Sequence, residues 1–245
     1  MFKALRSLRP KLPDRIVIGD RDVAVELREH ATARRIVMRV APGGEALRLT
    51  VPKRTPARTV LDFLKRHEGW AADRLSKATR SQIVGDGSVL PFRGGSLTVR
   101  YEASRRAASL SQTDEGLVLR VGGEAAHGAR RVKDFLVREA RRDLEAAVER
   151  HSSAVGIRPS GLALRDTVSR WGSCSSTRRL SFSWRIVMAP PAVLDYLAAH
   201  EVAHLREMNH GPDFWALCHE LCPATEEGRA WLKRHGASLH AVDFG

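Results

Sequence analysis

The chain has 245 residues, of which 43% are hydrophobic, so it can form one large or two modest domains with apolar cores. No stretch reaches the roughly 18 consecutive apolar residues of a membrane span, and the N-terminus lacks the apolar segment of a secretory signal peptide. The three cysteines, Cys174, Cys218 and Cys222, are odd in number and do not form a disulfide framework. We therefore expect a cytoplasmic protein that makes no membrane contact.

The formal net charge of +13 is concentrated in the N-terminal part of the chain. Residues 1–80 contain 19 Lys and Arg against 9 Asp and Glu, whereas residues 161–245 contain 9 of each. This basic excess predicts a contact with nucleic acid or another polyanion. We expect the contact to be non-specific, because aromatic residues are too sparse there for base recognition. The alternative is a solvated surface, since 34 of the 41 basic residues are Arg.

Residues 1–125 are predicted to be a basic region rich in β-strands. The prediction rests on short runs of β-branched and apolar residues separated by Gly and Pro. The expected elements are a loose arm at 1–14, strands at 15–18 and 23–27, a hairpin of 34–40 and 46–51, a helix over 57–77, and strands at 97–101 and 117–121. No internal repeat is evident in the sequence.

Residues 126–245 are predicted to form a second domain with more helix. Apolar residues recur there at helical spacing, and Gly and Pro mark the breaks. The expected elements are a helix at 129–154, strands at 161–168 and 180–187, a helix from Pro191 to about Asn209, a helix from Pro212, and a helix at 225–235. Together the two regions predict an α+β protein.

The most specific pattern in the chain is His200-Glu201-Val202-Ala203-His204 on a predicted helix. Residues four apart share a helix face, so His200 and His204 can bind one metal ion. Zn²⁺ binds imidazole nitrogens and leaves a fourth position for water in hydrolases. Glu201 follows the first histidine, where its carboxylate can take a proton from that water. The pattern predicts a zinc-dependent hydrolase with Glu201 as its catalytic acid and base.

The third metal ligand depends on where this helix ends. His210 can reach the ion if the helix stops before it, and Asn209 followed by Gly211-Pro212 predicts such a stop. Glu226 or Glu227 is the alternative third ligand, as in thermolysin-like enzymes. We favour His210.

The predicted helix has two distinct faces at 100° per residue. One is an apolar stripe that faces a core, and the other is an edge that faces a cleft. The stripe consists of Leu194, Ala198, Val202 and Leu205, and the edge consists of Tyr196, His200, His204 and Glu207. Because Glu207 lies about 10 Å along the helix from His200, we expect it to contact a ligand rather than to be one.

The segment Arg170-Trp171-Gly172-Ser173-Cys174-Ser175 has two interpretations. In a functional role it lines the cleft, offers its backbone to an extended peptide and places Arg170 near developing oxyanion charge. In a structural role Trp171 packs in the core, Gly172 forms a turn and Cys174 is buried. Tyr196, one turn before His200, is equally open to both. Arg170, Trp171 and Tyr196 are therefore the candidate substrate-binding residues.

The order of these segments resembles the YgjP-like (WLM-related) bacterial zinc metallopeptidases. The residues that carry the resemblance are Arg170 to Ser175, Leu180-Ser-Phe-Ser-Trp-Arg185, Ala189-Pro-Pro191, the His-Glu-x-x-His pattern with His210, and Phe214-Trp215. The resemblance implies a zincin-like C-terminal fold with a small twisted sheet beside the metal helix. It also implies His200, His204 and His210 as ligands and Glu201 as acid and base. Metzincins share the histidine spacing but have Gly where this chain has Glu207, so that name does not transfer.

The sequence therefore predicts a zinc metallopeptidase that acts on a peptide or protein substrate. Two alternatives stay open. One is a zinc hydrolase that acts on a nucleotide or another phosphate ester. The other is a non-catalytic nucleic-acid-binding protein with structural zinc, against which stands the preference of structural sites for four protein ligands.

Overall fold

The structure, a computed structural model, describes residues 12–19, 21–76, 81–103 and 107–245. The chain forms two compact units that divide between Gln82 and Ile83. The domain boundary predicted after residue 125 lies within the second unit. Independent folding of residues 126–245 stays a prediction. The mixed α+β character predicted from the sequence is confirmed, since small sheets and helices occur in both units.

The first unit contains a four-stranded sheet in the order β1-β2-β4-β3. The strands are β1 (Arg15–Ile18), β2 (Arg21–His30), β3 (Val37–Val40) and β4 (Ala46–Pro52). The middle pair β2 and β4 is parallel, and both outer pairs are antiparallel. The hairpin of β3 and β4 confirms the prediction, and the 3₁₀ turn η1 (Pro42–Gly44) lies between its strands.

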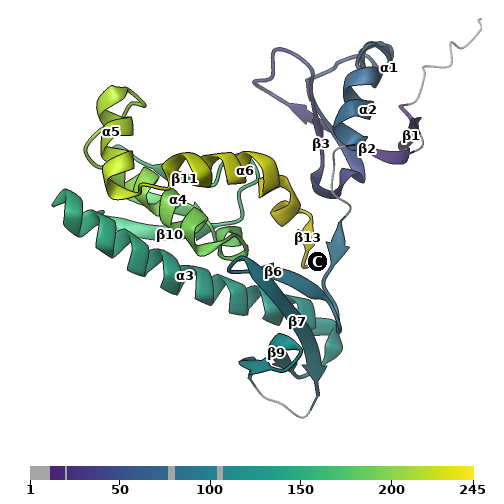
Figure 1. Ribbon diagram of the computed structural model, residues 1–245. Coiled ribbons are helices and arrows are strands. Elements are labelled where there is room, and N and C mark those ends of the chain that lie inside the picture. Colours follow the sequence, from purple (N-terminus) through teal and green to yellow (C-terminus); the bar gives the residue numbers. More distant parts are fainter. Residues whose placement is uncertain (1–11, 20, 77–80, 104–106) are drawn as a thin grey trace, which may run out of the picture. The chain divides into compact units, whose positions relative to one another are not determined.

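Two helices, α1 (Ala57–Arg66) and α2 (Glu68–Ser76), pack on this sheet (Figure 1). The single helix predicted over 57–77 is interrupted at His67, whose φ is −108° and whose Nδ1–H donates to the carbonyl oxygen of Phe63 at 2.8 Å. Alternate side chains of β4 point inward, as the period of a strand requires. The core of this unit includes Val23, Leu47, Leu49, Val51, Val60, Leu64, Ala71 and Leu75.

The second unit begins with another four-stranded sheet, in the order β6-β7-β9-β8. Its strands are β6 (Val89–Phe92), β7 (Gly95–Glu102), β8 (Ser109–Thr113) and β9 (Gly116–Gly122). Here too the middle pair is parallel and the outer pairs are antiparallel. Each sheet is followed by a helix, α1 in the first unit and, after the 3₁₀ turn η2 (Ala125–His127), α3 (Gly128–Val155) in the second. The same topology thus occurs twice.

A three-stranded sheet in the order β10-β12-β11 follows α3. β10 (Gly161–Arg165) and β12 (Arg179–Ser183) are parallel, and the edge strand β11 (Gly172–Cys174) is antiparallel to β12. Both predicted strands are present but shorter, because β12 passes into the 3₁₀ helix η3 (Trp184–Met188). β11 lies in a segment that the sequence predicted to be a connection.

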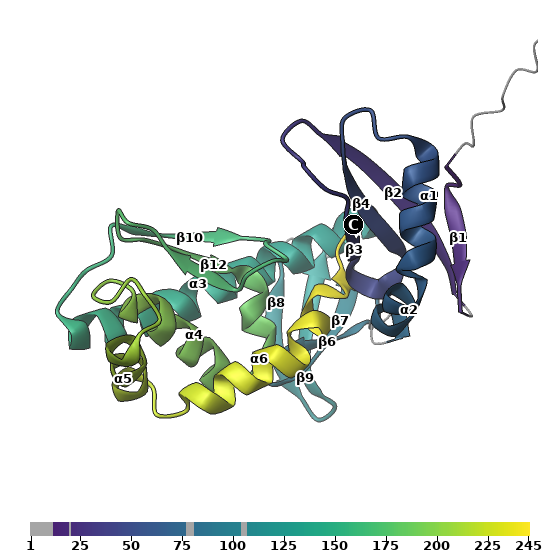
Figure 2. The same cartoon turned by 90° about the horizontal axis from the view of Figure 1, so that it is seen from above.

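The last three helices are α4 (Pro191–Ala203), α5 (Pro212–Leu221) and α6 (Thr225–His240). Figures 1 and 2 show α4 between α3 and α6, and it also contacts α5. A large apolar core joins α3, α4, η3 and the sheet of β6 to β9, and a smaller one joins α4 to α5. α4 is therefore the central helix of this unit.

The end of α6 is tied to η3 by Arg185, a side chain that is only 11% exposed. Its guanidinium donates to the carbonyl oxygens of Leu239 and Val242 at 2.9 and 2.8 Å, and to Asp166 Oδ1 at 2.6 Å. The short strand β13 (Val242–Asp243) follows and pairs with β5 (Gln82–Ile83). Among the described residues, no helix combines the length and the apolar character needed to cross a membrane.

Candidate metal centre

The helix α4 carries the His-Glu-x-x-His pattern in a largely buried setting. Pro190 precedes it in an extended conformation, and Pro191 occupies the first turn, where a backbone N–H is not needed. The predicted apolar stripe is buried, and His200 and His204 line a cleft as predicted. Tyr196 departs from the predicted cleft edge, because α5 and α6 also contact α4 and bury its side chain. The buried residues are Val193, Leu194, Tyr196, Leu197, Ala198, Ala199, Glu201, Val202 and Ala203.

The helix ends at Ala203, earlier than the predicted stop near Asn209. The next residues form a turn, in which the amides of Arg206 and Glu207 both donate to the carbonyl oxygen of Ala203, at 3.1 and 2.9 Å. Asn209 is not among the described non-glycine residues with positive φ, so the predicted left-handed stop is not used. The early end of α4 brings the chain back and places His210 beside the helix.

The imidazoles of His200, His204 and His210 converge on one point. Their ligand atoms all lie within 4.8 Å of one another, and Nε2 of His200 is 3.1 Å from Nε2 of His210. Two nitrogens bound to one tetrahedral zinc at about 2.05 Å are about 3.3 Å apart, so this spacing fits the ion. Among the described residues, no other group of three His, Cys, Asp or Glu side chains converges in this way.

Phe214 supports all three imidazoles from one side. It is fully buried, and its ring centroid lies 4.9 Å from that of His200, 4.4 Å from that of His204 and 4.6 Å from that of His210. The ring of His204 is stacked on it, and the other two meet it edge-on. An apolar platform of this kind fixes the ring orientations before any ion binds.

A backbone hydrogen bond selects the free nitrogen of His204. Its Nδ1–H donates to the carbonyl oxygen of Glu207 at 2.9 Å, which leaves Nε2 available to a metal. Glu207 therefore does contact a candidate ligand, through its backbone and not through its carboxylate. The alternative ligand Glu226 instead lies near His219 and Arg229, at 3.8 and 3.7 Å.

The surroundings of His200 and His204 favour the neutral form of the imidazole, which is the form that binds metals. Burial, together with the neighbouring His204, His210 and Arg229, lowers the pKa of His200 to about 4. Burial also lowers the pKa of His204, against the opposing effect of its hydrogen bond to Glu207. The Nδ1 atom of His200 is buried without a hydrogen-bond partner among the described residues. Burial thus keeps His200 and His204 in the form that suits a cation, and the exposed His210 completes the group at the mouth of the cleft.

Glu201 is a buried carboxylate beside the three histidines. It is 4% exposed, and its Oε2 atom has no hydrogen-bond partner among the described residues. Burial raises the pKa of this carboxyl to about 8, although the charge of Arg170 acts in the opposite direction. A pKa near neutrality is what a group needs in order to take and return a proton at physiological pH.

A cleft of about 240 Å³ opens onto this group. One wall is the edge strand β11, and the other is α4 with the turn that follows it. The cleft is lined by Gly172, Ser173, Cys174, His200, Glu201, His204, Met208 and His210. Burial, and then the charge of Glu201, raises the pKa of the Cys174 thiol.

The three candidate substrate-binding residues lie outside this lining. Arg170 is exposed and precedes β11. Trp171 is half-buried and stacks on His240 of α6, with ring centroids 4.7 Å apart. Tyr196 is 6% exposed and belongs to the core between α4 and α5, and burial raises its pKa to about 12. Contact of these residues with substrate stays a prediction.

Two residues of the site were not given these roles from the sequence. Phe214 was predicted as an apolar residue of the following helix, and its position four residues after His210 was the available signal. Gly172 was assigned a turn in the structural interpretation of its segment and a place along the cleft in the functional one; it begins β11, lines the cleft and packs directly against Glu201. Nothing in the local sequence indicates that contact, because the two residues belong to different elements.

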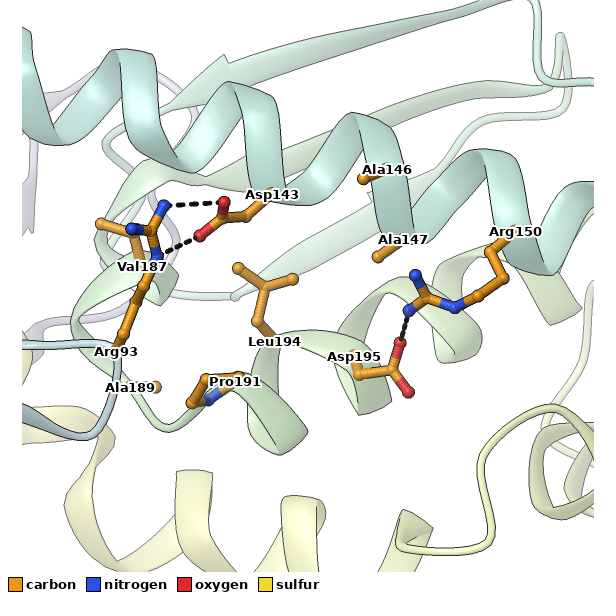
Figure 3. A pocket seen from close by; sticks show the side chains of 10 residues that line it. All are labelled: Arg93, Asp143, Ala146, Ala147, Arg150, Val187, Ala189, Pro191, Leu194 and Asp195. Carbon is orange, nitrogen blue, oxygen red and sulfur yellow. Dashed lines mark hydrogen bonds and ion pairs between the residues drawn. The ribbon is translucent and has the colours of Figure 1, made fainter.

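A second cavity of about 320 Å³ lies between α3 and α4 (Figure 3). Arg93 pairs with Asp143 at 2.7 Å at one end, and Arg150 pairs with Asp195 at the other. Asp195 also accepts from Nε2–H of the buried His151 at 2.7 Å. The pairs of Asp195 with Arg150 and His151 tie α4 to α3 a little over one turn before His200, whereas the pair of Arg93 and Asp143 ties the turn between β6 and β7 to α3.

Comparisons with known proteins give two matches. A family model described as YgjP-like, metallopeptidase domain, matches residues 34–235. Among solved structures, the metallopeptidase zymogen of Pyrococcus abyssi abylysin is 18% identical with a TM-score of 0.34, and the match covers 37% of this chain and 93% of that one. None of the curated proteins compared with the chain matches it.

Proposed function

Because the chain belongs to the YgjP-like metallopeptidase family, we propose that it is a zinc-dependent, zincin-like peptidase of the His-Glu-x-x-His type that cleaves peptide or protein substrates. The observation that carries the proposal is the convergence of His200, His204 and His210 beside the buried carboxylate of Glu201 in one cleft. The three imidazoles would hold the ion. Zinc bound there supplies Lewis acidity, which polarises the scissile carbonyl and acidifies a water molecule.

The residues of the chain perform the proton transfers and the positioning. Glu201 takes a proton from the attacking water and returns it to the leaving amine nitrogen. Its pKa of about 8 suits both directions, since the group gains and loses a proton near neutral pH. Phe214 and the carbonyl oxygen of Glu207 hold the imidazoles in place.

The edge strand β11 suits an extended peptide. The carbonyl oxygen of Trp171 accepts from the amide of Ser183, and the amide of Ser175 donates to the carbonyl oxygen of Arg179, so alternate residues of this strand face β12. The backbone groups of Gly172 and Cys174 therefore point to the open edge, beside the cleft. A substrate strand can add to such an edge by main-chain hydrogen bonds.

The test is Glu201→Gln, which preserves shape and removes the proton acceptor. We expect zinc content equal to that of the wild type and a loss of peptidase turnover of at least about 10²-fold. His204→Ala should lose both. Elemental mass spectrometry and cleavage of a quenched peptide library measure the two properties. Wild-type-like turnover by Glu201→Gln would contradict the mechanism.

A second measurement tests the ligand set. Zinc content is compared in the wild type and His210→Ala, after dialysis against a weak chelator. We expect about one zinc ion per chain in the wild type and a large loss in the variant. Retention of zinc in His210→Ala would move the third ligand elsewhere. Parallel cleavage panels of peptides and nucleotides separate a peptidase from a phosphate-ester hydrolase.

We also propose that the first unit makes a non-specific polyanion contact. The supporting observation is a groove of about 480 Å³ across β2, β3 and β4, lined by Glu26, Leu27, Arg28, Arg39, Arg48, Leu49 and Thr50. Binding of a labelled oligonucleotide should weaken with salt, and the slope should fall in Arg39→Ala. Arg58→Ala, which changes an exposed position on α1, is the matched control. Equal slopes in both variants would rule out this groove.

A further inference from the structure

We propose that Gly172 is a positioning residue for Glu201: the side-chain-free backbone of β11 forms the wall that sets where the carboxylate lies. The inference rests on the proposed role of Glu201 as proton acceptor. It assigns a specific task to a residue of the edge strand that neither binds the ion nor transfers a proton.

The contact between the two residues is unusually close. A Cβ atom added to Gly172 would lie 2.4 Å from Oε1 of Glu201, 2.7 Å from its Cγ and 2.8 Å from its Cδ. All three distances are far below ordinary van der Waals contact, so any side chain at this position must displace something. The carboxylate and the strand backbone are therefore packed against each other with no intervening space.

Backbone conformation does not explain the glycine. Gly172 is not among the described glycines with positive φ, and it occupies a regular β-strand paired with Phe182. An L-amino acid can adopt this conformation without strain. Glycine is needed at this position because of the space that Glu201 occupies.

The strand cannot move away to make room. The carbonyl oxygen of Trp171 accepts from the amide of Ser183 at 2.7 Å, and the amide of Ser175 donates to Arg179 at 3.0 Å, so β11 is fastened to β12 on both sides of Gly172. The ring of Trp171 is also held against α6, where it stacks on His240. A methyl group at position 172 must therefore push the side chain of Glu201.

The required displacement is large enough to affect catalysis. Bringing Oε1 from 2.4 Å to an ordinary contact distance takes a shift of about 1 Å. A misplacement of about 1 Å in a reacting group typically costs about 10²-fold in rate. The three heavy atoms nearest to the added Cβ all belong to Glu201, so we expect the displacement to fall on the carboxylate and the ion site to stay in place.

The experiment is Gly172→Ala, with Gly161→Ala on β10 at the opposite edge of the same sheet as matched control, because a Cβ atom there meets nothing within 4 Å. We expect zinc content and KM close to wild type in Gly172→Ala and a fall in kcat of about 10²-fold. Gly161→Ala should stay within about twofold of the wild type. Loss of zinc from Gly172→Ala, unchanged kcat, or an equal fall in the control would overturn the inference.

A second readout does not depend on activity. Unfolding by denaturant is measured on chelator-stripped protein for Gly172→Ala, Glu201→Ala and the double variant. We expect Gly172→Ala to raise the unfolding equilibrium constant at least about tenfold in the wild-type background and less than about threefold once Glu201 is truncated. If Gly172→Ala has the same effect on unfolding with and without the Glu201 side chain, the inferred contact between the two residues is refuted. If the wild type cleaves no peptide, the proposed function fails, while this double-variant cycle still tests whether Gly172 sets the position of Glu201.

Discussion

The burial of Glu201 predicts an unusual pH dependence of stability in the metal-free protein. The pKa of this carboxyl is about 8 in the folded chain, because burial disfavours its charged form, against an ordinary value of 4.5. Since the folded-state pKa is raised, the folded state binds the proton more tightly than the unfolded state does. The stability contribution is complete below pH 4.5 and is lost as the pH rises through 8.

The perturbation that isolates this effect is Glu201→Gln, which cannot ionise. A separation of 3.5 between the two pKa values corresponds to roughly 5 kcal/mol, of which roughly 3 kcal/mol falls between pH 5 and pH 8. We therefore expect the variant to gain about 3 kcal/mol on the wild type over that interval. The lowered pKa of His200 changes stability in the opposite direction at lower pH, but both proteins share it and it cancels in the difference.

The assay is guanidinium unfolding with a chelator present, followed by tryptophan fluorescence. Four of the five tryptophans, Trp171, Trp184, Trp215 and Trp231, lie in the second unit, so the signal reports mainly on the unit that contains Glu201. Glu220→Gln, the same chemical change at an exposed position of α5, should parallel the wild type. If the unfolding free energies of Glu201→Gln and the wild type depend on pH in the same way, water solvates the carboxylate and its pKa is not raised as its buried position implies.

Three further predictions follow from packing and charge. Phe214→Ala should lose about 4 kcal/mol of unfolding free energy and weaken zinc binding in a chelator competition; unchanged zinc affinity would mean that the platform does not hold the imidazoles. Burial alone would raise the pKa of Asp166, but the Arg185 guanidinium holds this pKa below its usual range. Asp166→Asn should therefore lower the free energy of unfolding by about 2 kcal/mol at neutral pH. That difference should vanish as the pH falls through the folded-state pKa of the carboxyl, and a difference independent of pH would exclude the ion pair as its cause. Gly128→Ala would place a Cβ atom 2.1 Å from the ring of Tyr101 and should cost about 2 kcal/mol in thermal unfolding, a loss that Tyr101→Leu should relieve; no relief would place the strain elsewhere.

The sequence predicted the components of the candidate site better than their surroundings. His200, Glu201 and His204 lie on one helix, so local geometry alone brings them together. His210 was predicted to converge on them, yet the reason given was wrong: α4 ends at Ala203 and the chain turns at once. Helix ends depend on tertiary packing, which residue preferences describe only in part.

Contacts between secondary-structure elements could not be predicted from the sequence. β11 has three residues, too few for a periodic signal, and its closeness to Glu201 follows from pairing with β12. The burial of Tyr196 follows from α5 packing on a second side of α4, so this residue of the predicted cleft edge lies in the core while His200 and His204 line the cleft. A period of 3.6 reveals one buried face of a helix but does not reveal a helix enclosed by several neighbours.

The duplicated sheet topology was likewise invisible in the residues. Both units use two antiparallel outer pairs around one parallel pair, and a helix follows each sheet. The strands of the two sheets share only their order and direction. These features constrain the pattern of apolar residues weakly, so the repeat leaves no clear signal in the sequence. Polar β8 (Ser109–Thr113) shows the difficulty, since an edge strand needs little apolar character.

Two units with separate apolar cores should also melt separately. Buried residues of the first unit form one cluster, and those of the second unit form others, so heating should give two calorimetric transitions instead of one. If the proposed site binds zinc, zinc added to the stripped protein binds the unit that contains His200, His204 and His210, and at 100 times its dissociation constant it stabilises that unit by about 2.7 kcal/mol. The melting temperature of the second unit should therefore rise with zinc concentration while that of the first unit stays constant. The first unit then serves as an internal reference in every calorimetric measurement on the second.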